Sequence, residues 1–138
     1  MTAAQPQSIY ETFQMIGFRD YRRDDGAVVV ELPVAPHVKN TNGGLQGGLL
    51  ATLVDIAAGR LAVEVIPPEL SVVTSDLSIR YLRPIKSGAA RATARIVYSG
   101  KRSLVMQVDI VTLPDEELAA IATVSFATVR RNQREEST

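Results

Sequence analysis

The apolar and polar positions of the chain separate one long apolar stretch from several alternating ones. Residues 47–66 are apolar nearly all round, and a pair of prolines follows them directly. This pattern predicts a central helix over 47–66 that is buried in the protein's own core. A weaker helical spacing is set by Ile9, Phe13 and Ile16. It predicts a short helix over 7–16.

Most of the remaining chain alternates between apolar and polar residues with a period of two, as strands do. Residues 26–34 form one candidate strand ahead of the central helix. Four more follow it in succession, in "LSVVTSDLSIRYLRP", "GAARATARIVYSG", "SLVMQVDIVTL" and "LAAIATVSFATV". The period places Leu77 and Tyr81 on one face of the first of these and Thr74 on the other. The last is apolar on both faces, which is typical of a central strand.

These elements predict a single α+β domain over residues 1–138. Four successive strands form an antiparallel meander with one apolar face, and the central helix is the only large apolar object that can cover it. We therefore expect the sheet to wrap around this helix. The small side chains of Ala90, Ala92 and Ala94 fit this expectation, since they let a helix lie close to a sheet. The charged residues 130–138 predict a frayed tail.

The composition excludes several classes of function. The chain has no cysteine, which rules out disulfides, thiolate metal sites and cysteine nucleophiles. Fifteen basic residues balance fifteen acidic ones, so no charge favours a nucleic-acid partner. The first residues lack the pattern of a signal peptide. The central stretch is long enough to cross a bilayer but carries Asp55, Arg60 and Glu64. We expect a cytoplasmic protein with no membrane partner and no metal.

The candidate chemistry begins in "GGLQGG", residues 43–48, at the start of the central helix. The first turn of a helix has free backbone N–H groups and a partial positive charge. Gly47 and Gly48 carry no side chain there, so the carbonyl oxygen of a ligand can approach these groups as in an oxyanion hole. Glycines in this place also permit a tight turn or close packing, and both interpretations stay open.

Asp55 lies about two turns further along the same helix, among apolar neighbours. It is too deep to cap the helix, and an unpaired carboxylate in such surroundings costs on the order of several kcal/mol. A carboxylate in this position suits a general base. A structural partner, or a helix face open to solvent, would explain it equally well.

The segment "NTNGGLQGGLLATLVDIAAG" resembles the signature of hotdog-fold acyl-CoA thioesterases, in particular the PaaI-like branch of the 4-hydroxybenzoyl-CoA thioesterase type. In that pattern an Asn lies six residues before an HGG triplet, and an Asp or Glu lies nine residues after the triplet's first position. Asn40, Gln46 and Asp55 have this spacing, and two glycines complete the triplet. The resemblance extends over about residues 10–130.

This resemblance implies a hotdog fold and the hydrolysis of an acyl-CoA thioester to the free acid and CoA. The Gly47 N–H would polarise the thioester carbonyl. Asp55, contributed by the neighbouring subunit, would act as a general base or as the nucleophile. Asn40 would orient the water or hold the substrate, and Thr74 would help to position the nucleophile.

The resemblance also implies partners. Members of the family form homodimers with shared active sites, which often pair again into tetramers. Coenzyme A is part of the substrate, so no separate cofactor is expected. Basic residues near the sheet edge and the hairpin turns meet the CoA phosphates in this family, and the candidates here are Arg83, Lys101 and Arg102.

Gln46 departs from the pattern, since the family usually has histidine there. A glutamine amide can donate a hydrogen bond, so an orienting or structural role remains, but it cannot carry a proton. Gly59 likewise offers no side chain where some relatives place a hydroxyl. The only histidine, His37, is expected in an exposed turn. Two other functions stay open: a non-catalytic acyl-CoA-binding module, and a hotdog dehydratase or hydratase, which would need a histidine beside the helix.

Overall fold

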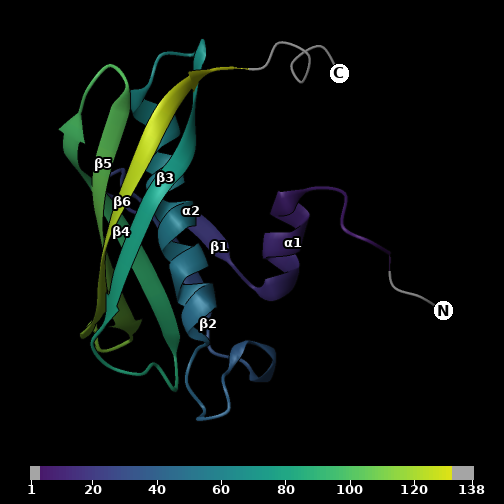
Figure 1. Cartoon of the computed structure of the whole chain (residues 1–138). Coiled ribbons are helices and arrows are strands. Elements are labelled where there is room, and N and C mark those ends of the chain that lie inside the picture. The colour runs from purple at the N-terminus through teal and green to yellow at the C-terminus, as the bar shows by residue number, and fades with distance from the viewer. Residues whose placement is uncertain (1–3, 132–138) are drawn as a thin grey trace.

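The computed structural model describes residues 4–131, where an antiparallel sheet wraps around one long helix (Figure 1). Its helices are α1, a short 3-10 turn η1, and α2. Its strands are β1 to β6. In chain order the bounds are α1 Ile9–Ile16, β1 Arg19–Arg22, β2 Val28–Pro33, η1 Pro36–Val38, α2 Gly47–Val65, β3 Leu70–Tyr81, β4 Ala89–Ser99, β5 Ser103–Leu113 and β6 Leu118–Arg130.

The predicted α+β class and the sheet wrapped around a central helix are confirmed. The central helix ends at Val65, one residue before its predicted end. Helix α1 begins at Ile9, two residues after its own predicted start. Part of the predicted tail, residues 132–138, lies outside the described residues. In the described part of the chain, no helix is long and apolar enough to cross a bilayer.

The strand order is β1-β2-β4-β5-β6-β3. Strands β4, β5 and β6 form the expected meander, but β3 pairs with β6 and not with β4. The prediction of a four-strand meander is therefore wrong for its first strand. The connection after β3 passes the start of α2, where the Leu45 N–H donates to the Ile85 carbonyl (2.9 Å), and β2 takes the place beside β4. As a result β3 is an edge strand.

The core lies between α2 and the inner face of the sheet. Ala90 and Ala92 are fully buried there, so the expected close approach of helix and sheet is confirmed for them. Strand β6 lies between β5 and β3, as its two apolar faces predicted. The larger buried side chains of this core come from both layers. They include Leu50, Leu53, Val54, Leu104, Met106, Val108, Ile110 and Val124.

Strand β3 contains a bulge at Ser75 that changes which side chains face α2. Thr74 pairs with Phe126 and Asp76 with Ser125, so Ser75 is one residue extra. Phe126 is a buried core residue, and Thr74, directly opposite it, faces inward. The predicted opposition of Thr74 to Leu77 and Tyr81 is thus wrong, because a bulge shifts the period by one residue.

One buried carboxylate fastens β1, a strand that the sequence pattern did not reveal, to the sheet. Glu31 on β2 is only 4% exposed. It accepts hydrogen bonds from Arg19 (3.2 Å), Tyr21 and Arg91 (3.1 Å). Burial alone would raise the pKa of Glu31, but the hydrogen bonds from Tyr21 and Arg91 and the charges of Arg91 and Arg19 outweigh it and lower the pKa. All four β1 side chains are exposed, so no alternating pattern marked this strand.

Candidate active site

Asp55 lies on α2 with its carboxylate held by β3. Thr74 donates a 2.7 Å hydrogen bond from its Oγ1 to Asp55 Oδ1. The aspartate is partly exposed within one chain, so it is not sealed in the helix core. One carboxylate oxygen is fixed by the threonine. The structure therefore brings together two of the predicted site residues.

The start of α2 presents two backbone amides without partners. Gln46 caps the helix, accepting a 2.7 Å hydrogen bond at its Oε1 from the Leu49 N–H. Among the described residues, the Gly47 and Gly48 N–H groups meet no hydrogen-bond acceptor. The glutamine thus has a structural role, which is one of the two roles left open for it, and the glycine amides remain available to a ligand.

Tyr81 completes this end of the helix and was missed by the sequence reasoning. Its hydroxyl donates to the Gly47 carbonyl at 2.6 Å, and a Cβ on Gly47 would lie 3.4 Å from its ring. Burial raises the pKa of Tyr81, so the hydroxyl keeps its proton and remains a donor. Tyr81 anchors the peptide between Gly47 and Gly48. The only signal in the sequence was the alternation that places Tyr81 on the apolar face of its strand.

Asn40 organises the loop that leads into α2. Its Oδ1 accepts hydrogen bonds from the N–H groups of Asn42 (2.9 Å) and Gly44 (3.1 Å). The side-chain oxygen is therefore engaged in an Asx turn, and the amide nitrogen is the group left to face a ligand. Asn40 lines a hollow of about 330 Å³ together with Gly47, Tyr81 and Arg83.

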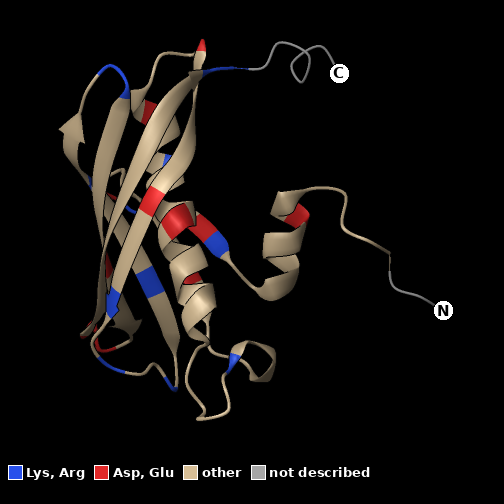
Figure 2. Ribbon diagram, viewed as in Figure 1, with Lys and Arg blue, Asp and Glu red and all other residues tan. Residues whose placement is uncertain are grey.

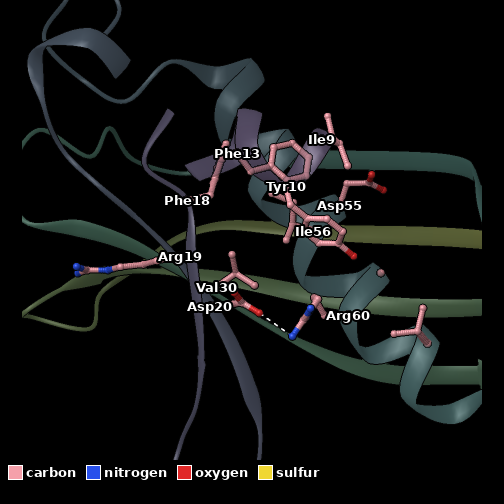
Figure 3. A pocket seen from close by; sticks show the side chains of 12 residues that line it. Ile9, Tyr10, Phe13, Phe18, Arg19, Asp20, Val30, Asp55, Ile56 and Arg60 are labelled. Atoms are coloured by element: carbon pink, nitrogen blue, oxygen red, sulfur yellow. Dashed lines mark ion pairs between the residues drawn. The ribbon is translucent and has the colours of Figure 1, made fainter. Parts of the chain in front are cut away.

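Asp55 lies at a different hollow of about 240 Å³, between α1 and α2 (Figure 3). Along α2 it is eight residues from Gly47, which at about 1.5 Å per residue is roughly 12 Å. One carbonyl group cannot contact both within a single chain. The predicted residues therefore form two half-sites: Asn40, Gln46 and Gly47 in one, Asp55 and Thr74 in the other.

Basic residues lie at both ends of the molecule (Figure 2), and the three candidate phosphate contacts divide between these ends. Arg83 shares the hollow with Gly47, where its Nη1 forms a 2.7 Å ion pair with Glu117. Lys101 lines another hollow beside Val65, at the far end of α2. Arg102 follows it in the β4–β5 turn. Within one chain, Lys101 and Arg102 are thus not brought to Gly47.

His37 is exposed in η1, as expected, and its Nε2 lies 2.6 Å from the Ile16 carbonyl oxygen. It is part of neither half-site. Within residues 4–131, no group of three histidine, aspartate or glutamate side chains comes together as a metal ion would require. The groups available for chemistry at the two half-sites are a fixed carboxylate, free backbone amides and neutral amide side chains.

An antiparallel sheet wrapped around one long helix is the hotdog fold. The chain belongs to the Thioesterase superfamily, whose family description matches residues 42–119, more than half of its length. The matched segment includes Gln46, Gly47, Asp55 and Thr74.

Individual relatives agree with this membership. The solved structure of the BH2602 protein from Bacillus halodurans, with CoA, is 32% identical with a TM-score of 0.81, covering 94% of this chain and 83% of that one. A 1,4-dihydroxy-2-naphthoyl-CoA hydrolase from Listeria monocytogenes is 28% identical, over 87% of this chain and 97% of the relative. A proposed esterase from Halobacterium salinarum is 35% identical over 66% of this chain, which spans 63% of that relative.

Proposed function

We propose that the protein hydrolyses acyl-CoA thioesters at a site shared by two copies, in which Gly47 of one copy and Asp55 of the other face the same carbonyl. The observation that carries this proposal is the hydrogen bond that fixes Asp55 on Thr74 at the edge of a largely apolar hollow. The printed names of the Bacillus relative, solved with CoA, and of the Listeria CoA hydrolase support a CoA thioester as the substrate.

The proposed reaction uses Asp55 in one of two ways. As a general base, its carboxylate takes a proton from water while the water oxygen attacks the thioester carbonyl carbon. As a nucleophile, it attacks that carbon itself, and water then cleaves the resulting anhydride. In both, the Gly47 N–H donates to the developing oxyanion, the C–S bond breaks, and CoA leaves as the thiolate, which then takes up a proton.

A thioester suits this sparse machinery. Its carbonyl is electrophilic, and a thiolate leaves with little help from an acid. A site without a histidine can therefore carry out this reaction, whereas a dehydratase would need a proton carrier where Gln46 caps the helix. In the mechanism, Gln46 keeps the first turn of α2 in place and Asn40 offers its amide nitrogen to the substrate or to the water.

The sharing of the site between two copies rests on the edge strand β3. Within residues 4–131 only β6 pairs with it, and a free edge of twelve residues is a template for another strand. Its inner face carries Thr74, bound to Asp55, and Tyr81, bound to Gly47. In an antiparallel pairing of two β3 strands centred near Ser78, the Thr74 end of one copy would lie beside the Tyr81 end of the other.

This arrangement also assigns roles to the basic residues. Arg83 would contact the phosphates of a CoA whose thioester lies at Gly47 of the same copy, since both line one hollow. Lys101 and Arg102 would reach that CoA only from another copy, for example in a pair of dimers. A CoA contact at Arg83 competes with its ion pair to Glu117.

The first experiment measures thiol release from acetyl-, hexanoyl-, benzoyl- and palmitoyl-CoA by the wild type and by Asp55→Asn. We expect kcat to fall by about 10²-fold or more, the usual contribution of a positioned general base. Asp76→Asn, on the opposite face of β3, is the matched control and should keep full activity. Equal turnover by wild type and Asp55→Asn would remove Asp55 from its role, and acyl-CoA binding without any thiol release would favour the non-catalytic module.

The second experiment tests the shared site. In Gly47→Val, the new side chain would fill the space in front of Tyr81, so this variant should be inactive, as should Asp55→Asn. Mixing the two after subunit exchange should restore about a quarter of the wild-type activity, because half of the dimers are then mixed and each has one intact site. If each copy contained a complete site, the mixture would stay inactive.

A further inference from the structure

The hollow beside Asp55 is formed by α1 on one side and α2 on the other (Figure 3). Ile9 and Phe13 of α1 and Ile56 of α2 give it apolar walls. No residue of α1 is fully buried, and Ile9 is 58% exposed, so the helix leaves apolar surface uncovered over this space. Apolar walls with a few polar groups are typical of sites for small molecules.

Gly59 keeps the hollow open one turn beyond Asp55. A Cβ at this position would meet no atom within 4 Å, so the space in front of it is empty. A glycine inside a helix costs about 1 kcal/mol relative to alanine. Neither a turn nor a positive φ requires a glycine at this position, in the middle of α2. We therefore attribute the glycine at position 59 to the open space that it leaves in the hollow.

An ion pair forms part of the wall of the hollow further along the helix. Arg60 Nη2 lies 2.7 Å from Asp20 Oδ2, which joins α2 to β1, and both residues line the hollow. Figure 3 shows this pair across the space from Asp55. Arg60 follows Asp55 by five residues, about 7.5 Å along the helix axis at about 1.5 Å per residue. The hollow continues past this pair as far as Val63, so the pair forms part of a side wall.

We propose that this hollow holds the acyl group of the thioester, and that Gly59 leaves the room that a single-ring or medium-length acyl group needs. This inference rests on the proposed function. The volume of about 240 Å³ equals that of about eight water molecules at about 30 Å³ each. A benzoyl or hexanoyl group has about this many non-hydrogen atoms, whereas a palmitoyl group has about twice as many. A palmitoyl group would thus extend beyond the hollow.

The test compares kcat/KM for acetyl-, hexanoyl-, benzoyl- and palmitoyl-CoA. We expect the wild type to prefer hexanoyl- and benzoyl-CoA. Gly59→Leu should lower kcat/KM for these two by about tenfold or more while that for acetyl-CoA stays near the wild-type value, since a few methylenes discriminate by this much. Gly59→Ala should give a smaller change in the same direction. An equal loss on all four substrates, or no loss, would overturn the inference.

A second pair of variants uses α1. Ile9→Ala removes a wall of the hollow and should lower kcat/KM for hexanoyl-CoA relative to that for acetyl-CoA. Met15→Ala on the same helix is the matched control, because Met15 is 62% exposed and does not line the hollow. If both variants behaved alike, α1 would have no part in acyl recognition.

Widening the hollow gives the opposite effect. The double variant Asp20→Ala, Arg60→Ala removes part of the wall and should raise kcat/KM for palmitoyl-CoA relative to benzoyl-CoA, and an unchanged ratio would contradict the placement of the acyl group in this hollow. Binding of non-hydrolysable acyl-CoA thioethers, measured by calorimetry in the same variants, separates this inference from the proposed function. A preference for the hexanoyl thioether that is lost in Gly59→Leu would support the acyl site even if no thioester were hydrolysed.

Discussion

Thr74 and Asp55 are joined by a 2.7 Å hydrogen bond between a strand and a helix that both belong to the same chain. They meet because the bulge at Ser75 turns Thr74 toward α2, onto the face that Leu77 and Tyr81 occupy after the bulge. The bond leaves the second carboxylate oxygen of Asp55 without a partner among the described side chains. A carboxylate held in this way presents one oxygen in a fixed direction.

Removing the hydroxyl of Thr74 should reduce turnover. In Thr74→Val the shape is kept but the donor is lost, and a hydrogen bond to a charged group is worth about 1.5–3 kcal/mol. We expect kcat to fall by about tenfold or more, with little change in KM. Thr74→Ser retains the donor and should keep most of the activity. Steady-state kinetics of the two variants check this, and equal losses would indicate a packing effect alone.

Tyr81→Phe should loosen the first turn of α2. The ring stays over Gly47, but the hydrogen bond to the Gly47 carbonyl is lost. We expect the free energy of unfolding to fall by about 1 kcal/mol and kcat to fall severalfold, because the neighbouring amides are less firmly held. Tyr98→Phe, at an exposed position on β4, is the control. Chemical denaturation and thiol release measure the two effects, and unchanged kinetics would contradict the anchoring role.

Gln46 can be tested for its capping role and for the missing histidine. Gln46→Ala removes the acceptor for the Leu49 N–H and should lower the free energy of unfolding by about 1 kcal/mol, as the loss of a helix N-cap does. Its effect on kcat should be much smaller than that of Asp55→Asn. Gln46→His restores the residue that the resemblance implies. A large gain in rate for that variant would show that the present site works below its capacity.

Replacing Glu31 should weaken the attachment of β1 and change the acid stability. Because the folded protein holds the pKa of Glu31 below its ordinary value of 4.5, the ionised carboxylate stabilises the fold above that value, and this contribution is lost as the pH falls through the lower pKa of the folded state. Glu31→Gln should cost about 2 kcal/mol at pH 7. Urea denaturation between pH 3 and pH 7 should show a smaller pH dependence for the variant.

The elements could be predicted where one physical pattern dominated. The apolar stretch from Gly47 to Val65 predicted a buried helix, and the two apolar faces of β6 predicted an interior strand. Strand β1 could not be found, because all four of its side chains are exposed and show no alternation. The place of β3 at the edge likewise depends on the pairing of β2 with β4, and no local periodicity encodes it.

The candidate site divides in the same way. The resemblance identified Gly47 and Asp55 by their spacing, and the structure supplies what spacing omits. Tyr81 reaches Gly47 across 34 positions of the chain. The inward turn of Thr74 depends on one extra residue in β3, which a strict period of two misassigned. The capping role of Gln46 follows from the geometry of its side chain, which a sequence pattern does not contain.

The pairing of β3 with β6 sets the order in which the chain can fold during synthesis. Helix α2 leaves the ribosome well before β6, the strand that joins β3 to the rest of the sheet. Until residues 118–130 emerge, β3 has no partner strand within the chain, and its backbone groups stay open to other nascent chains. The six-stranded sheet can therefore be completed only after β6 has been synthesised.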